Sequence, residues 1–236
     1  MNRTKIEWTD FSWNPTSGCT KISEGCLNCY AEKMSKRLKA MGTPKYRNGF
    51  DLTLHSETLK EPYSWKKSKM VFVNSMSDLF HEDVPLSFIQ EVFTVMNNNP
   101  RHIFQILTKR ADILERYSPF LKWSTNIWMG VTVESDLHFS RIDHLRRTGA
   151  IVKFLSCEPL LTSLKNMNLF EIDWVIVGGE SGVKVRPIEK EWVIEIKDMC
   201  QSINIPFFFK QWGGTNKKKT GSLLDGISYK NIPLCV

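Results

Sequence analysis

Short apolar runs recur along the chain, and each is followed by polar residues and then by a stretch with helical spacing. Six such runs occupy residues 70–73, 103–107, 127–131, 151–155, 174–177 and 207–209. Continuous apolar runs of this length are typical of strands that are buried on both faces. Between them, apolar residues three or four positions apart, as at Leu86, Ile89 and Phe93, indicate helices. The alternation predicts a parallel sheet covered by helices.

Residues 1–18 add a further candidate strand with Trp8, Phe11 and Trp13. The total of about six or seven strand–helix units is too small for an eight-fold barrel. We therefore expect an α/β fold, a partial (open) parallel β/α barrel, formed by a single domain over residues 1–236. From about residue 215 the chain becomes polar and rich in lysine, and we expect a weakly structured tail there.

The 236 residues carry a net charge of +7, which permits a polyanionic partner such as nucleic acid without requiring one. The excess lies largely in residues 33–45, 60–69 and 217–219. No apolar stretch follows the N-terminus and no run approaches the length of a membrane span, so we expect a cytoplasmic protein without a membrane partner. In that compartment clustered cysteines indicate metal binding rather than disulfides.

Three of the six cysteines, Cys19, Cys26 and Cys29, lie within eleven residues in the pattern C-x6-C-x2-C. Thiolates this close in sequence converge readily on one soft ion or cluster. A closed structural zinc site needs four ligands, and the nearest histidine, His55, is distant in sequence. Three local ligands therefore indicate an open coordination position. An iron–sulfur cluster, a zinc knuckle completed by a distant histidine, and a disulfide with a spare thiol all remain open at this point.

Polar side chains follow nearly every predicted strand. In parallel barrels the carboxyl ends of the strands carry the functional groups, so these residues are expected around one mouth together with the cysteines. The strand ends supply Asn74, Ser75, Asp78, Thr108, Lys109, Arg110, Thr132, Glu134, Ser156, Glu158, Gly178, Gly179, Glu180, Ser181, Lys210 and Gln211. Of these, Lys109, Glu158 and Lys210 are our candidate catalytic residues, together with Cys157. The lysines and Arg186 suit an anionic group on a substrate.

Asn14-Pro15, the two Gly-Cys pairs and Cys29-Tyr30-Ala31 resemble the cluster loop of radical S-adenosylmethionine (radical SAM) enzymes, above all the branch of spore photoproduct lyase. The loop departs from the common superfamily pattern in having six residues rather than three between its first two cysteines. Segments around residues 74–82, 106–110, 156–161, 178–182 and 208–213 resemble a phage-associated family of unassigned function with a three-cysteine motif.

The resemblance implies a 4Fe-4S cluster held by Cys19, Cys26 and Cys29, with S-adenosylmethionine on the free iron. It implies that Tyr30 packs near the adenine, that Asn74, Ser75 and Asp78 face the methionyl amine, and that Thr132 and Glu134 suit the ribose. Thr108 is a further candidate cofactor contact. Gly178-Gly179-Glu180 is similar to the glycine–glutamate element of the superfamily, although it follows a late strand. Cys157 would be a hydrogen-atom donor, as a thiol is in spore photoproduct lyase.

The function we expect is therefore a radical SAM enzyme, with reaction unassigned, that generates a deoxyadenosyl radical and modifies or repairs a nucleic acid base or nucleotide. It would need an external electron donor. Two alternatives stay open. One is a zinc-stabilised nucleic-acid-binding protein without catalysis, and the other is an enzyme that activates water on a three-cysteine zinc.

Overall fold

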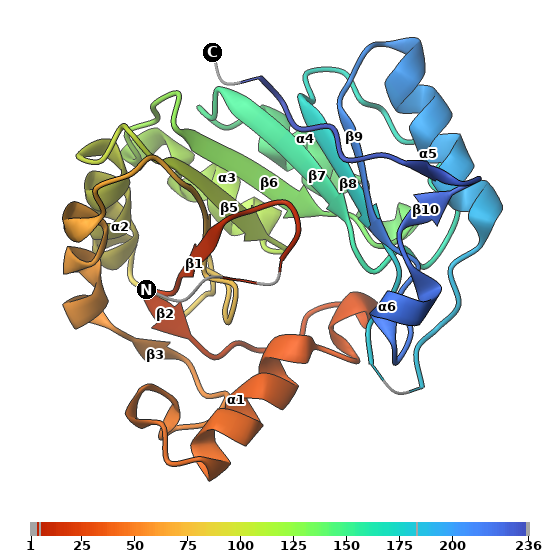
Figure 1. Ribbon diagram of the computed structural model, residues 1–236. Coiled ribbons are helices and arrows are strands. Elements are labelled where there is room, and N and C mark those ends of the chain that lie inside the picture. Colours follow the sequence, from red (N-terminus) through yellow and green to blue (C-terminus); the bar gives the residue numbers. More distant parts are fainter. Residues whose placement is uncertain (1–3, 5, 183, 235–236) are drawn as a thin grey trace.

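The computed structural model describes residues 4, 6–182 and 184–234, and its centre is a seven-stranded parallel sheet. The strand order is β1-β4-β5-β6-β7-β8-β9, so that each strand pairs with the next in sequence within the sheet. Figure 1 shows the sheet curling into an open half-barrel, which confirms the predicted fold class. The strands are β1 Phe11–Trp13, β4 Met70–Val73, β5 Ile103–Thr108, β6 Ile127–Thr132, β7 Val152–Cys157, β8 Trp174–Gly178 and β9 Phe207–Gln211.

Four helices lie on the outer face of the sheet (Figure 1). They are α2 Leu86–Asn97, α3 Ala111–Tyr117, α4 Ser140–Arg146 and α5 Lys190–Ser202. The apolar stripe of α2, including Ile89, Val92 and Met96, is fully buried, as its helical spacing predicts. Between β7 and β8 the described chain forms no helix, and the connection buries Leu160, Leu164 and other apolar side chains instead. The main hydrophobic core therefore lies between the sheet and this outer layer.

The concave side of the sheet is filled by aromatic rings. Alternate residues of a strand face opposite sides, so one side chain in two from each strand points inward. The inward cluster is formed by Trp8, Phe72, Trp128, Phe154, Trp174, Ile176 and Phe208. Gly130 is needed here because a Cβ at this position would lie 2.5 Å from the Phe154 ring. These side chains fill the interior of the half-barrel below the carboxyl ends of its strands.

The chain between β1 and β4 forms an excursion that carries the cysteines. It contains the short antiparallel pair β2 Thr16–Ser17 and β3 Thr53–Leu54 and the helix α1 Tyr30–Ala40. In Figure 1, α1 lies across the open side of the half-barrel, between the first strands and the end of β9. Met34 on α1 is exposed, as is Met41 directly after the helix. Within the described residues, the 3-10 turns are Glu24–Cys26, Pro44–Tyr46, Ser56–Lys60, Pro62–Ser64, Ser118–Phe120 and Asp136–His138.

The segment after residue 215, where we expect a weakly structured tail, contains short elements. It forms α6 Lys217–Thr220 and the antiparallel pair β10 Leu223–Leu224 and β11 Ile227–Ser228. Leu224 is buried in the main core, and Phe209 donates its backbone N–H to the Tyr229 carbonyl at 2.9 Å. Leu224 and Tyr229 therefore connect this segment to the core and to β9. None of the helices described is both long and apolar enough to span a bilayer.

Candidate functional site

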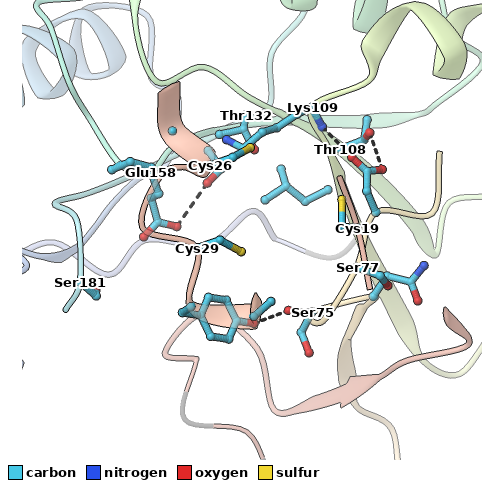
Figure 2. A pocket seen from close by; sticks show the side chains of 18 of the residues that line it. Cys19, Cys26, Cys29, Ser75, Ser77, Thr108, Lys109, Thr132, Glu158 and Ser181 are labelled. Carbon is cyan, nitrogen blue, oxygen red and sulfur yellow. Dashed lines mark hydrogen bonds between the residues drawn. The ribbon is translucent and has the colours of Figure 1, made fainter. Parts of the chain in front are cut away.

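One pocket, of about 270 Å³, lies at the carboxyl ends of the strands. Its walls come from the loop that carries the cysteines (residues 18–29, the cysteine loop), from α1, and from the ends of β4 to β9. Figure 2 shows Cys19, Cys26 and Cys29 around the pocket, with Thr108, Lys109 and Thr132 on one side and Glu158 and Ser181 on another. The aromatic cluster closes the pocket from below through Trp8 and Phe72.

The three cysteines reach the pocket from three different local structures. Cys19 follows Gly18, whose φ of 83° and lack of a Cβ are both required, because a Cβ would lie 2.2 Å from the Asp51 carbonyl oxygen. Cys26 ends a 3-10 turn, and Cys29 is the N-cap residue of α1. All three thiols are free. Within the described residues, no three His, Cys, Asp or Glu side chains converge closely enough to hold a single metal ion.

Arg110, at the end of β5, holds the first part of the cysteine loop. Its buried guanidinium donates to the Cys19 sulfur at 3.4 Å and to both the carbonyl and the hydroxyl oxygen of Thr20 at 3.2 and 2.7 Å. Two carboxylates balance its charge, Asp78 at 3.3 Å and Glu82 at 2.7 Å. Burial and the Asp78 charge raise the pKa of Cys19 to about 11, and the nearby guanidinium offsets this only in part.

Glu134, at the end of β6, holds the middle of the cysteine loop. Its fully buried carboxylate accepts hydrogen bonds from Ser23 and, at 2.7 Å, from Arg141, and it pairs with Lys109 at 3.1 Å. Gly25 packs directly against this carboxylate, since a Cβ there would lie 2.7 Å from Glu134 Oε1. Burial opposes the charge on Glu134, but its cationic neighbours keep the pKa below the ordinary value.

Residues that follow two further strands form hydrogen bonds with the same loop. Glu180, after β8, accepts a hydrogen bond from Asn28 at 2.9 Å and pairs with Arg186. His81, after β4, lies 2.9 Å from the Thr20 hydroxyl through its Nε2, while its Nδ1 accepts the Asp83 N–H. The cysteine loop is thus held by side chains from the ends of β4, β5, β6 and β8. This arrangement fixes where the three sulfurs lie relative to the pocket.

The donor set fits an iron–sulfur cluster with a bound polar cofactor. Thiols are the usual ligands of such clusters, and ligands on separate irons do not need to meet at one point. A buried donor at the pocket also lacks a hydrogen-bond acceptor. Asn74 Nδ2, on a side chain only 2% exposed, has none among the described residues, whereas Lys109 Nζ has the Glu134 carboxylate as its ion-pair partner at 3.1 Å. Buried donors of this kind normally find a partner, so the pocket suits a ligand that carries acceptors.

Most of the predicted site residues lie together at this pocket. In addition to the cysteines, its lining includes Tyr30, Asn74, Ser75, Asp78, Thr108, Lys109, Thr132, Glu158, Gly179, Glu180 and Lys210. Lys210 and Glu158 form an ion pair of 2.9 Å, and Ser156 donates to the second Glu158 oxygen at 3.2 Å.

Four predicted residues, Glu134, Cys157, Gly178 and Arg186, do not line the pocket. Glu134 lies beneath the cysteine loop, as described above. Cys157 is fully buried in the main core, because it alternates with the inward-facing Ser156. Gly178 packs against the Glu158 side chain. Gly179 does line the pocket, but it must be glycine because a Cβ would lie 2.1 Å from the Trp212 carbonyl. Both glycines therefore serve packing within the chain.

Several residues of the site carry no role in the sequence-based prediction. Ser23, Gly25 and Asn28 belong to the cysteine loop, and Arg141 lies on α4. The position of Gly25 directly before Cys26 was a signal for this glycine. Ser23 and Asn28 have partners more than 100 residues away in sequence, so no local pattern indicates them.

Two solved structures similar to this chain are both of spore photoproduct lyase. One is complexed with dinucleoside spore photoproduct, with a TM-score of 0.47 and 11% identity over 84% of this chain and 62% of that one. The other is a mutant with bound AdoMet and dinucleoside spore photoproduct, with a TM-score of 0.46 and 10% identity over 79% of this chain and 59% of that one. The chain thus spans about three fifths of the length of these proteins. A comparison with curated proteins finds no match. By its sequence over residues 3–233, the chain belongs to the family described as "Protein of unknown function (DUF5131)".

Proposed function

We propose that this protein is a radical SAM enzyme that acts on a nucleic acid base or nucleotide. The observation that carries the proposal is the set of three free thiols from one anchored loop, which meet a single pocket at the carboxyl ends of a parallel half-barrel. Side chains from four strand ends hold that loop, so many of the polar residues at the mouth fix the positions of the cysteines. Three thiols held in fixed positions suit the ligands of a cofactor.

In this proposal Cys19, Cys26 and Cys29 ligate a 4Fe-4S cluster, and S-adenosylmethionine occupies the pocket beside it. The bound cofactors supply one-electron chemistry and the abstraction of a hydrogen atom from the substrate. The residues best placed to hold S-adenosylmethionine are Tyr30, Asn74, Ser75, Thr108 and Thr132, which all line the pocket. The unpartnered Asn74 amide would donate to a cofactor oxygen.

Asp78, Glu134 and Glu180 have a different role in this proposal. Each of them is buried and engaged by cations and by the cysteine loop or its anchors. They would therefore position the cluster ligands rather than bind the ribose or the methionyl amine. The aromatic cluster below would exclude water from the reacting atoms.

The Lys210–Glu158 pair and Lys109 are the groups we propose to meet the substrate. Lys109 has only one carboxylate partner, and both lysines line the pocket. Lysine makes charge-assisted contacts to phosphate and carboxylate groups. Together with the net charge of +7, this supports a nucleotide or a nucleic acid as the substrate class.

The test is anaerobic reconstitution with iron and sulfide, followed by electron paramagnetic resonance of the reduced protein with and without S-adenosylmethionine. We expect a cluster signal that changes when S-adenosylmethionine is added. Replacing Cys19, Cys26 or Cys29 by alanine should abolish it, whereas Cys157→Ala, in the core, should retain it. A protein without a cluster signal that holds stoichiometric zinc instead would support the zinc-stabilised binding protein.

A further inference from the structure

The floor of the pocket comes from the part of the chain that precedes β1. Ile6 and Trp8 both line the pocket, and Trp8 belongs to the aromatic cluster that fills the half-barrel. The indole of Trp8 is 2% exposed and makes an edge contact with the Phe72 ring, with 4.7 Å between the ring centroids. In Figure 1 this first part of the chain, coloured red, lies on the concave side of the sheet. A ligand that fills the pocket to its floor therefore meets Trp8.

The floor is held in place by contacts on both sides of Trp8. Gln105 Nε2 donates to the Trp8 carbonyl at 3.3 Å, and Lys230 Nζ lies 2.6 Å from the Glu7 carboxylate. Lys230 also donates to the Phe209 carbonyl at 2.7 Å, so it joins the floor to β9. Trp8 is thus fixed relative to the sheet, as a residue that selects a ligand needs to be.

The indole N–H of Trp8 has no hydrogen-bond acceptor among the described residues. Two equally buried tryptophans differ in this respect. Trp13 donates to the Thr58 carbonyl at 3.0 Å, and Trp174 donates to the Asn231 carbonyl at 2.9 Å. Buried indole N–H groups usually have a partner, because an unpaired buried donor is costly. For a residue that lines a pocket, a bound ligand is the natural partner.

The side chains that face the interior change from aromatic to polar towards the mouth of the pocket. On β7 Phe154 is followed by Ser156, and on β9 Phe208 is followed by Lys210. The two phenylalanines belong to the aromatic cluster, whereas Ser156 and Lys210 line the pocket. The pocket therefore has an apolar floor with one unpaired donor and a cationic group nearer its mouth. A nucleotide has the same order, with a ring that carries acceptors at one end and a phosphate at the other.

We propose that the base of the substrate enters the pocket first and that the Trp8 N–H donates to an acceptor on its edge, an inference that rests on the proposed function. The acceptor is a carbonyl oxygen or a ring nitrogen. The phosphate stays nearer the mouth, where Lys210 makes a charge-assisted contact. S-adenosylmethionine lies beside the cysteines in the proposed function, and the cysteine loop is above the floor, so the floor is left for the substrate. Trp8 thus determines specificity for a heteroaromatic ring.

The test measures ligand affinities of the reconstituted protein by isothermal titration calorimetry. The probes are the four deoxynucleoside 5′-monophosphates, deoxyribose 5-phosphate, which lacks the base, and S-adenosylmethionine. The variant is Trp8→Phe, which keeps an aromatic ring and removes the N–H. The matched control is Trp174→Phe, in the same aromatic cluster but outside the pocket lining, whose N–H is bound by the Asn231 carbonyl.

We expect the unaltered protein to bind at least one monophosphate more tightly than deoxyribose 5-phosphate. Trp8→Phe should weaken that binding about fivefold, the usual effect of losing one hydrogen bond, and leave the affinities for deoxyribose 5-phosphate and S-adenosylmethionine unchanged. Its midpoint of unfolding in urea should also be unchanged, because the N–H has no acceptor within the described chain. Trp174→Phe should lower this midpoint and keep the affinity for the monophosphate.

An unchanged monophosphate affinity in Trp8→Phe would overturn the inference, and so would equal affinities of the unaltered protein for the monophosphates and deoxyribose 5-phosphate. Weaker binding of S-adenosylmethionine alone would also overturn it, because the N–H would then serve the cofactor. The proposed function fails separately, if reconstitution gives no iron–sulfur signal. Monophosphate binding that depends on the base and on Trp8 would support the inference in that case too.

Discussion

Arg110 donates a hydrogen bond to the Cys19 sulfur at 3.4 Å while its guanidinium is held between Asp78 and Glu82. The residue is 4% exposed, so its orientation is fixed by these contacts. Of the three cysteine sulfurs, Cys19 is the one that the structure pairs with a cationic donor, whereas Cys26 lies 3.6 Å from the Ser23 hydroxyl. Arg110 thus joins the cysteine loop to the ends of β4 and β5.

Replacing Arg110 by methionine should destabilise the fold by about 3 kcal/mol, because removing one partner of a buried ion pair leaves a buried charge uncompensated. Glu82→Gln, at a carboxylate that is 52% exposed, should cost less than about 1 kcal/mol. The measurement is the free energy of unfolding in urea. Equal losses for the two variants would show that Arg110 does not act through Asp78.

Gly25→Ala should displace the cysteine loop, because the added Cβ would lie 2.7 Å from Glu134 Oε1, a carboxylate fixed by Arg141 and Lys109. We expect the iron bound after reconstitution to fall several-fold. Ser23→Ala, which removes one hydroxyl from the same carboxylate without adding a clash, should retain most of the iron. Full iron loading of the glycine variant would mean that the loop tolerates the shift.

Cys157 and Cys200 should resist alkylation in the folded protein. Both are fully buried, and burial raises the pKa of Cys200 to about 12, which leaves little of the reactive thiolate. Peptide mass spectrometry after treatment with iodoacetamide should find both unmodified in buffer and modified in urea. Rapid labelling of Cys157 in buffer would instead place its thiol within reach of the pocket.

Glu115 should make part of the free energy of unfolding depend on pH below about pH 4.5. Hydrogen bonds from Arg147 and then His144 lower its pKa to about 2, below the usual value near 4.5. Because the folded pKa is depressed, this contribution is present above about pH 4.5 and is lost as the pH falls towards 2. Urea unfolding across this range should show a weaker pH dependence for Glu115→Gln than for Glu91→Gln, an exposed residue on α2. Identical pH profiles would contradict the assignment.

The strands and outer helices could be predicted from the sequence because their periodicity is local. Continuous apolar runs such as residues 127–131 identify buried strands, and the spacing of Ile89, Val92 and Met96 identifies the buried side of α2. The contacts of the segment after residue 215 could not be predicted, because Leu224 and Tyr229 meet elements that are far away in sequence.

The gathering of strand-end residues at one mouth could be predicted, whereas the contacts that each residue makes could not. The rule that strand ends gather polar groups places Asn74, Thr132 and Glu158 at one mouth, and all three line the pocket. It does not tell a ligand contact from a loop anchor, and Glu134 is an anchor whose partner Ser23 is 111 residues away. Such pairings depend on how the cysteine loop folds over the mouth, and no local pattern records that.

The metal and sulfide content of anaerobically purified and reconstituted protein tests the central claim most directly. Our account predicts about four irons and about four sulfides per chain, as in a 4Fe-4S cluster, and their loss when Cys19, Cys26 or Cys29 is replaced by alanine. One zinc per chain without sulfide would contradict it.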